Sequence, residues 1–223
     1  MSESTPRKPG RHFLQIPGPS NVPDRLLRAM AKPTIDHRGP EFAQLTLRIL
    51  ERLQLVSQTS GPVILFPSSG TGAWEAALVN TLSQGDRVLA FETGQFAALW
   101  RDVAVRLGIE VVWVEGDWRH GVDPSVVQAK LAEDASRAIK AVLVVHGETS
   151  TGITSRVDQV RQAIDKVAHP ALLMVDTVSS LGTTDYRHED WGVDVTISGS
   201  LLNVSNQAPD LIFGEAVIII EVV

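Results

Sequence analysis

Apolar runs of strand length alternate with amphipathic segments of helix length along most of this chain. The expected strands lie within residues 62–67, 86–92, 110–116, 139–148, 171–178 and 193–198. The expected helices between them lie within residues 68–82, 95–108, 124–134 and 156–168. Because the strands are rich in Val, Ile and Leu and alternate with helices, they predict βαβ units. The pattern therefore favours an α/β fold with three αβα layers around a mostly parallel sheet.

The chain before this alternation has a different character. Residues 1–22 are rich in Pro, Gly, Ser and charge, which predicts an extended N-terminal arm, with Pro23 at the start of a helix. Residues 40–56 carry apolar side chains every three or four positions, which predicts an amphipathic helix. We find no internal repeat, so residues 23–200 are expected to form one domain.

Composition narrows the classes of function. Of 223 residues, 43% are hydrophobic and 21% charged, as in ordinary folded proteins. The net charge of −6 and the scattered basic residues argue against a nucleic-acid partner. No apolar run reaches the roughly 18 residues of a membrane span, and the N-terminus lacks a signal-peptide core, so we expect a cytoplasmic protein with no membrane partner. Cysteine is absent and the histidines are not at ligand spacings, so no metal site is expected.

Ligands of parallel sheets bind beyond the carboxyl ends of the strands, where small and polar residues occur here. The run Ser69–Gly72 between a strand and a helix suits a phosphate, although a plain N-capped turn would read the same way. Gly70, Gly72, Glu75 and the later Glu92 also imitate a dinucleotide fingerprint, but imperfectly, because Glu75 stands where close helix packing needs Gly or Ala.

An acidic residue closes the most apolar strand. The carboxylate of Asp176 is costly there unless a cation or a donor meets it. With a phosphate cradle and the aromatic Phe96, it suggests pyridoxal phosphate, which needs a phosphate cup, a flat side chain against its ring, a carboxylate at its ring nitrogen and a lysine. Three of these four parts have candidates in the sequence.

Several motifs now occur together and in order. They are "PGPSNVPDRLLRAM", "DHRGPEF", "FPSSGTGAWEAALVNTLSQGDRVL", "GQFAALW", "VVHGETSTG" and "LLMVDTVSSLGTTDYRHEDWGVDVTISGS". Over about residues 11–200 the chain closely resembles the class V aminotransferases, specifically the serine–glyoxylate and alanine–glyoxylate aminotransferases. The resemblance implies a fold-type I enzyme, a homodimer, that uses pyridoxal phosphate to move an amino group from serine or alanine to glyoxylate and so gives glycine.

The resemblance also implies roles for individual residues. The coenzyme would be bound by Ser69, Gly70, Thr71, Phe96, Thr149, Asp176 and Val178. The first three would hold its phosphate, Phe96 would stack on its ring, Thr149 would bond the ring oxygen, and Asp176 with Val178 would bind and sandwich the ring. The substrate would lie near Pro19, Ser20 and Asn21. The segment "DHRGPEF" would lie near the dimer contact.

The chain departs from the family after Ser200. There the family continues with Gln-Lys-Gly, whose lysine forms a Schiff base with the coenzyme, whereas Leu202 occupies that position here. Residues 201–223 resemble no part of the family, so we expect a fold-type I large domain that is incomplete at its C-terminus and lacks the small domain. A frameshift, an altered splice or an early stop would give such an ending. A sheet cut off at this point would leave a strand edge uncovered.

Three hypotheses follow. The first is a serine–glyoxylate type aminotransferase of which this chain is a truncated and inactive form. The second is a non-catalytic partner that keeps the coenzyme pocket or the dimer surface of a full-length subunit. The third, and weakest, is an NAD-dependent oxidoreductase.

Overall fold

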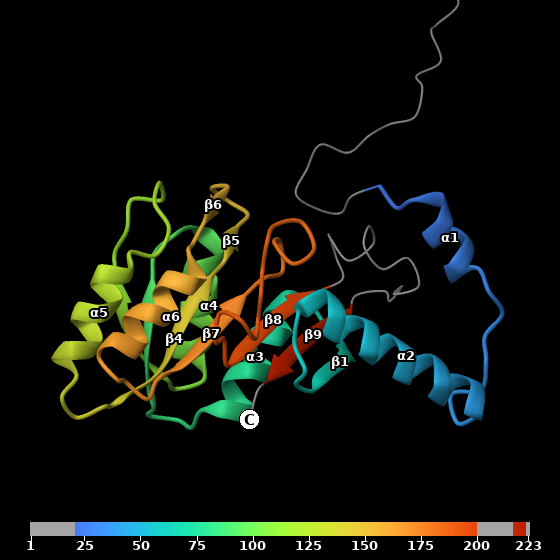
Figure 1. Ribbon diagram of the computed structural model, residues 1–223, viewed down its shortest axis with the longest axis horizontal. Coiled ribbons are helices and arrows are strands. Elements are labelled where there is room, and N and C mark those ends of the chain that lie inside the picture. The colour runs from blue at the N-terminus through green and yellow to red at the C-terminus, as the bar shows by residue number, and fades with distance from the viewer. Residues whose placement is uncertain (1–20, 200–215, 222–223) are drawn as a thin grey trace, which may run out of the picture.

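The computed structural model describes residues 21–199 and 216–221, which build one seven-stranded sheet in the order β1-β9-β8-β7-β4-β2-β3. Its strands are β1 (Val63–Pro67), β2 (Arg87–Phe91), β3 (Glu110–Val114), β4 (Ile139–Val145), β7 (Leu172–Asp176), β8 (Val195–Gly199) and β9 (Ala216–Glu221). The strands β2, β3, β4, β7 and β8 pair in parallel. A short antiparallel pair, β5 (Gly147–Glu148) and β6 (Ile153–Thr154), rises beyond the end of β4 (Figure 1).

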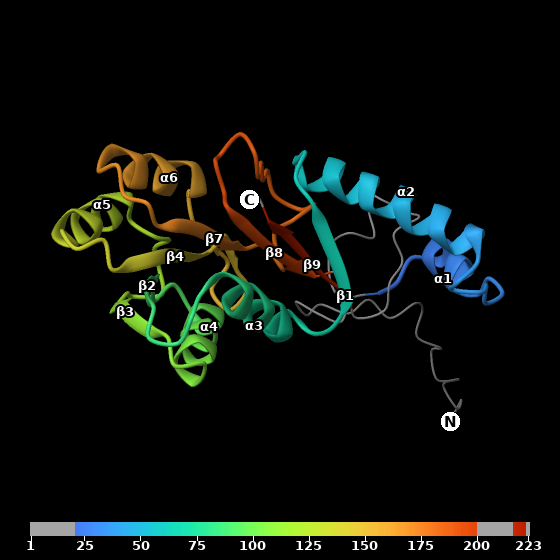
Figure 2. The same ribbon diagram turned by 90° about the horizontal axis from the view of Figure 1, so that it is seen from below.

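Helices cover both faces of the sheet (Figure 2). They are α2 (Pro40–Ser57), α3 (Gly70–Thr81), α4 (Gln95–Arg106), α5 (Pro124–Glu133) and α6 (Val157–Lys166), whereas α1 (Asp24–Met30) lies to one side of the sheet. The apolar sides of α3 and α4 share one buried cluster with the sheet, and those of α5 and α6 share another. The helix α2 packs on β1 through Ile49, Leu53 and Val63. The predicted three-layer αβα fold and all of its expected strands are confirmed.

The edge that the sequence predicted to be uncovered is paired. The strand β9 lies between β1 and β8 and runs antiparallel to both, so that Ile219 faces Ile64 on one side and Ile197 on the other. The prediction was wrong because the pairing of this C-terminal run with β1 and β8 is a property of the tertiary fold, which the sequence pattern does not report. A β-branched run such as "AVIII" satisfies the backbone donors and acceptors of two neighbouring strands whatever its origin.

The strand directions determine where a ligand site can form. Because β9 is antiparallel to both neighbours, β1 runs in the same direction as β8 and the other parallel strands. The carboxyl ends of β1, β2, β4, β7 and β8 therefore meet along one edge of the sheet. Within residues 21–199 and 216–221, no helix is long and apolar enough to span a membrane.

We expect proline at position 219 to destabilise the chain. Ile219→Pro removes a backbone donor from a strand with partners on both sides and should lower the free energy of unfolding by about 2 kcal/mol or more. Ile219→Ala keeps the backbone donor and serves as the matched control in urea unfolding. Equal losses in the two variants would contradict the pairing of β9.

Candidate functional site

Loops from four strand ends converge at the carboxyl edge of the sheet. They follow β1, β2, β4 and β7, and every described residue that was predicted to bind the coenzyme lies in one of these loops or in the first turn of α3 or α4. Backbone hydrogen bonds tie the loops together, since the N–H of His146 donates to the carbonyl of Asp176 at 2.9 Å. The candidate site is therefore assembled from segments that lie far apart in the sequence.

The side chain of Asp176 is a buried acid at the centre of the candidate site. It is 4% exposed at the end of β7. Its Oδ1 accepts from the N–H of Val178 at 2.8 Å, and its Oδ2 accepts from the indole N–H of Trp74 at 2.8 Å. Burial raises the pKa of Asp176 to about 6 against the lowering effect of these two hydrogen bonds, and nearby Glu148 adds to the rise. A cation at this carboxylate would relieve the burial cost.

The donor Trp74 was missed by the sequence analysis. Its place on the apolar side of α3 predicts a core residue, and it is indeed 3% exposed and stacked on Trp100, with ring centroids 5.9 Å apart. Its indole N–H nevertheless bonds a residue 102 positions away. Helical periodicity reports only the face on which a side chain lies, so no local signal distinguishes this tryptophan from a purely structural one.

The loop after β1 has the geometry of an anion-binding turn. Ser69 caps α3, its Oγ accepting from the N–H of Gly72 at 3.3 Å. A Cβ atom built on Gly70 would lie 3.5 Å from Cγ2 of Val178, so this loop and the turn after β7 are in contact. Thr71 lies exposed in the first turn of α3. Ser69, Gly70 and Thr71 thus stand at a helix N-terminus, where free N–H groups and the helix dipole favour a phosphate.

A second buried acid holds the first turn of α4, which carries Phe96. Glu148 is 1% exposed, and its carboxylate accepts from the N–H groups of Phe96 at 3.3 Å and Ala97 at 3.1 Å. Its Oε1 also accepts from the hydroxyl of Ser150 at 2.6 Å. These bonds satisfy donors in the first turn of α4. Glu148, which the sequence analysis did not single out, therefore fixes the backbone position of Phe96.

The approach of Glu148 to α4 requires a glycine. A Cβ atom on Gly94 would lie 2.5 Å from Cγ of Glu148, a distance that side chains do not tolerate. Thr149 follows Glu148 and its hydroxyl is hydrogen bonded to that of Ser179, in the turn after Asp176. The hydroxyl of Thr149 thus lies next to the turn that carries Val178.

Three predicted positions lie outside the described residues: Pro19, Ser20 and Leu202. Asn21 lies exposed in the segment before α1, and its place near a substrate stays a prediction. The seven coenzyme positions are brought to one edge of the sheet, and their binding roles likewise stay predictions.

The acidic residue of the imitated dinucleotide fingerprint is already engaged. The carboxylate of Glu92 accepts from the indole N–H of Trp118 at 3.0 Å and from the N–H of Gly116 at 3.3 Å. It therefore holds the loop after β3. Glu75 is exposed on α3. Neither carboxylate supports the oxidoreductase hypothesis.

A buried polar network underlies the site on the opposite face of the sheet. Nδ1 of His146 is bonded to Oγ of Ser180 at 2.9 Å, and Nδ1 of His188 to Oγ1 of Thr196 at 2.7 Å. The ring of Tyr186 packs 5.3 Å from that of His146. Burial lowers the pKa of His146 and that of His188 to about 4 each, so both imidazoles are neutral in the folded chain at pH 7.

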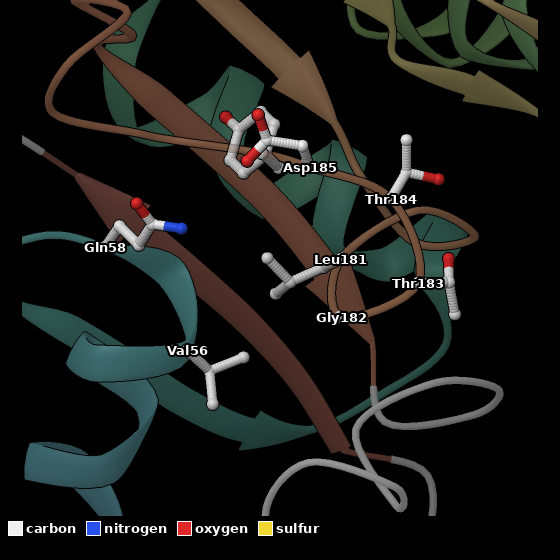
Figure 3. A pocket seen from close by; sticks show the side chains of 8 residues that line it. Val56, Gln58, Leu181, Gly182, Thr183, Thr184 and Asp185 are labelled. Carbon is white, nitrogen blue, oxygen red and sulfur yellow. The ribbon is translucent and has the colours of Figure 1, made fainter.

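A small pocket lies beside this network, at Tyr186 (Figure 3). Its volume is about 280 Å³, and it lies between the end of α2 and the loop after β7. It is lined by Val56, Gln58, Leu181, Gly182, Thr183, Thr184, Asp185 and Tyr186. None of the residues that were predicted to bind the coenzyme lines this pocket, so we do not assign it to the candidate site.

Comparison with known proteins decides the family. The sequence pattern described as "Aminotransferase class-V" matches residues 12–201. The chain belongs to the class V aminotransferases. A serine–glyoxylate aminotransferase of Methylorubrum extorquens is 50% identical over 195 residues, which are 87% of this chain and 48% of that protein. An L-aspartate–glyoxylate aminotransferase of Paracoccus denitrificans is 46% identical over 83% of this chain and 47% of its own length. The chain thus spans about half the length of these relatives.

Solved structures agree with this class V fold. An alanine–glyoxylate aminotransferase from Nostoc sp. superposes with a TM-score of 0.83 at 29% identity, over 99% of this chain and 56% of that one. A ureidoglycine–glyoxylate aminotransferase from Bacillus subtilis gives 0.85 at 25% identity, over 97% and 54%. Both matches extend over almost all of the present chain.

Membership of the class V family implies pyridoxal phosphate as the cofactor. The residues of this chain fit that molecule. Within the described residues, no Lys, Arg or His forms an ion pair with Asp176, so its carboxylate is available to a protonated ring nitrogen. The N-terminus of α3 suits the phosphate, and Phe96 offers a flat face.

Replacing Glu148 should loosen the start of α4. In Glu148→Gln one carboxylate oxygen becomes an amide N–H₂ that faces backbone donors, and we expect a loss of about 1–3 kcal/mol in the free energy of unfolding. Urea unfolding at pH 7 measures it. Glu75→Gln, in an exposed position of α3, is the control, and a loss no larger than the control's would contradict the assigned role.

The buried histidines should make stability depend on pH. Between about pH 6.5 and 5 the unfolded chain binds protons on His146 and His188 that the folded chain does not, so both contributions are present above pH 6.5 and are lost on acidification. Asp176, with its raised pKa, opposes them in this range. In this range the unfolded chain therefore binds about one proton more than the folded chain. The free energy of unfolding should fall by roughly 1.4 kcal/mol for each unit by which the pH is lowered.

Two variants test this assignment by urea unfolding between pH 5 and 6.5. His188→Asn should flatten the profile, because one histidine and Asp176 then cancel. His37→Asn, at a side chain that is 72% exposed, should leave the slope unchanged. A flat profile in the unaltered chain would show that the imidazoles are not held neutral.

Proposed function

We propose that this chain is the coenzyme-binding part of a pyridoxal-phosphate-dependent aminotransferase that transfers an amino group from serine or alanine to glyoxylate. The buried carboxylate of Asp176, held by two N–H donors, carries the proposal. The names of the relatives support glyoxylate as the acceptor, and they include serine, aspartate and alanine as donors.

Each residue of the site has a physical task in this proposal. The N–H groups at the start of α3 and the hydroxyl of Ser69 or Thr71 bind the phosphate. Asp176 holds a proton at the ring nitrogen through its negative charge. Phe96 and Val178 contact the two faces of the ring and exclude water from them. Thr149 donates to the ring oxygen. The coenzyme supplies an electron sink for the substrate's α-carbon.

The chain as given is proposed to lack transaminase activity. The position of the family's lysine is taken by Leu202. Of the five lysines, Lys130 and Lys166 stand in the last turns of α5 and α6, and Lys140 lies near the start of β4. These three lie at the amino edge of the sheet, opposite the site, and Lys32 lies in the exposed segment after α1. None of the described lysines can replace the missing amine.

A homodimer, or a partner role beside a full-length subunit, is supported by the first two helices. They expose large apolar side chains, namely Leu27, Met30, Phe42, Leu47 and Leu55. Leu55 is 77% exposed and Leu47 is 62% exposed. Monomeric proteins seldom leave so much apolar surface uncovered, and Phe42 belongs to the motif expected near the dimer contact. We propose that a second class V subunit covers α1 and α2.

Binding of pyridoxal phosphate tests the proposed function. The chain should bind the coenzyme non-covalently and saturably, lose it on gel filtration, and show no attachment after borohydride treatment. Leu202→Lys should permit attachment by borohydride, because it returns an amine to the position that the family uses. Asp176→Ala should weaken binding by about tenfold or more, in keeping with the loss of a charge-assisted contact.

The control for these measurements is Asp117→Ala, which removes an exposed carboxylate in the loop after β3. It should bind the coenzyme as the unaltered chain does. A chain that responds to NAD and not to pyridoxal phosphate in a thermal shift would refute the proposed function. Turnover of serine and glyoxylate by the unaltered chain would refute its inactivity.

A further inference from the structure

The hydrogen bond between Trp74 and Asp176 is not explained by packing. A buried tryptophan in an apolar cluster can leave its N–H without a partner, as Trp100 does in the same stack. Trp74 instead directs its N–H at Oδ2 of Asp176 at 2.8 Å. An N–H donor to a carboxylate is about twice as strong as a bond between neutral groups, and it is stronger still in a buried environment.

The two donors fix the plane of the carboxylate. The N–H of Val178 reaches Oδ1 from within the turn after β7, and the indole of Trp74 reaches Oδ2 from α3. With one donor on each oxygen, rotation about the last bond of the side chain would break both hydrogen bonds. Each oxygen keeps a further lone pair for a ligand.

We propose that Trp74 is a positioning residue that orients the carboxylate of Asp176 toward the ring nitrogen of pyridoxal phosphate and stabilises its charge. The proposal rests on the proposed function, because the coenzyme gives the orientation its purpose. It goes beyond the coenzyme contacts expected of the site, since Trp74 acts through another residue.

Through Trp74, the helix α3 connects the phosphate end of the site to Asp176. The same helix begins at Gly70, where the phosphate would bind, and is capped by Ser69. Trp74 lies little more than one turn further along, buried and stacked on Trp100. A rigid helix therefore fixes the spacing between the phosphate end and the ring-nitrogen end of the site.

The charged surroundings of Asp176 set the direction of the expected effect. Among the described residues, Glu148 is the charged group that acts on it, and Glu148 raises its pKa. The backbone N–H of His146 donates to the backbone carbonyl of Asp176, and the imidazole ring of His146 is neutral at pH 7. The bond from Trp74 opposes Glu148 and burial by lowering the pKa. Removing that bond must raise the pKa of Asp176 further.

Trp74→Phe keeps an aromatic ring on Trp100 and removes the N–H. We expect it to weaken the binding of pyridoxal phosphate by about tenfold at pH 7 and to move the acidic limb of the binding profile to higher pH. Trp100→Phe is the matched control, because it removes an indole from the same stack whose N–H has no partner. It should change affinity little and leave the pH profile in place. Equal affinities and equal profiles in the two variants would overturn the proposal.

A measurement without coenzyme separates this proposal from the proposed function. In the chain labelled with ¹³C at its aspartate carboxyls, the signal of Asp176 is identified by its loss in Asp176→Asn and is followed against pH. Its pKa should be higher in Trp74→Phe than in the unaltered chain and unchanged in Trp100→Phe. An unchanged pKa in Trp74→Phe overturns the role of Trp74 whether or not the coenzyme binds.

Two further outcomes are decisive. If the unaltered chain binds no pyridoxal phosphate while the pKa of Asp176 responds to Trp74, the proposed function fails and the charge-stabilising contact stands. If Trp74→Phe does not fold, the ¹⁵N-labelled unaltered chain replaces it. One indole N–H signal must then shift with the titration of Asp176, and the absence of any such signal overturns the proposal.

Discussion

The burial of Asp176 is the constraint on which the candidate site depends. A carboxylate that is 4% exposed at the end of an apolar strand loses most of its hydration. The chain compensates with the backbone N–H of the following turn and the indole of α3. These donors offset part of the cost but leave the pKa raised to about 6, so the carboxylate is still under-stabilised. That residual cost is what a bound cation at the sheet edge would remove.

A second buried acid beside it shows the opposite arrangement. Glu148 is as deeply buried, yet its oxygens accept from backbone donors at the start of α4 and from Ser150. Its acceptors are used for structure, and it fixes Phe96. Asp176 has fewer donors and an open lone pair on each oxygen. The number of internal donors thus separates an acid that builds the site from one that is available to a ligand.

The sequence predicts the fold well because its signal is local. Strands of continuous apolar residues and helices of regular period were placed within a few residues of their observed ends, and α2 begins at Pro40 as predicted. The strand β9 was missed as part of the sheet, since pairing with β1 and β8 is a property of the tertiary fold. The hairpin of β5 and β6 has two residues in each strand, too few for any periodicity.

Some residues of the candidate site could likewise be predicted from the sequence, and others could not. Residues that follow a strand, such as Asp176, could be selected because the carboxyl ends of parallel strands are known to meet. Trp74 and Glu148 could not, because their importance lies in partners 102 and about 50 positions away. In the sequence, Trp74 has the pattern of a core residue and Glu148 that of an acid in a loop. Residues that would contact a ligand follow the carboxyl ends of the strands, and the topology predicts those positions. Residues that hold them in place can come from any part of the core.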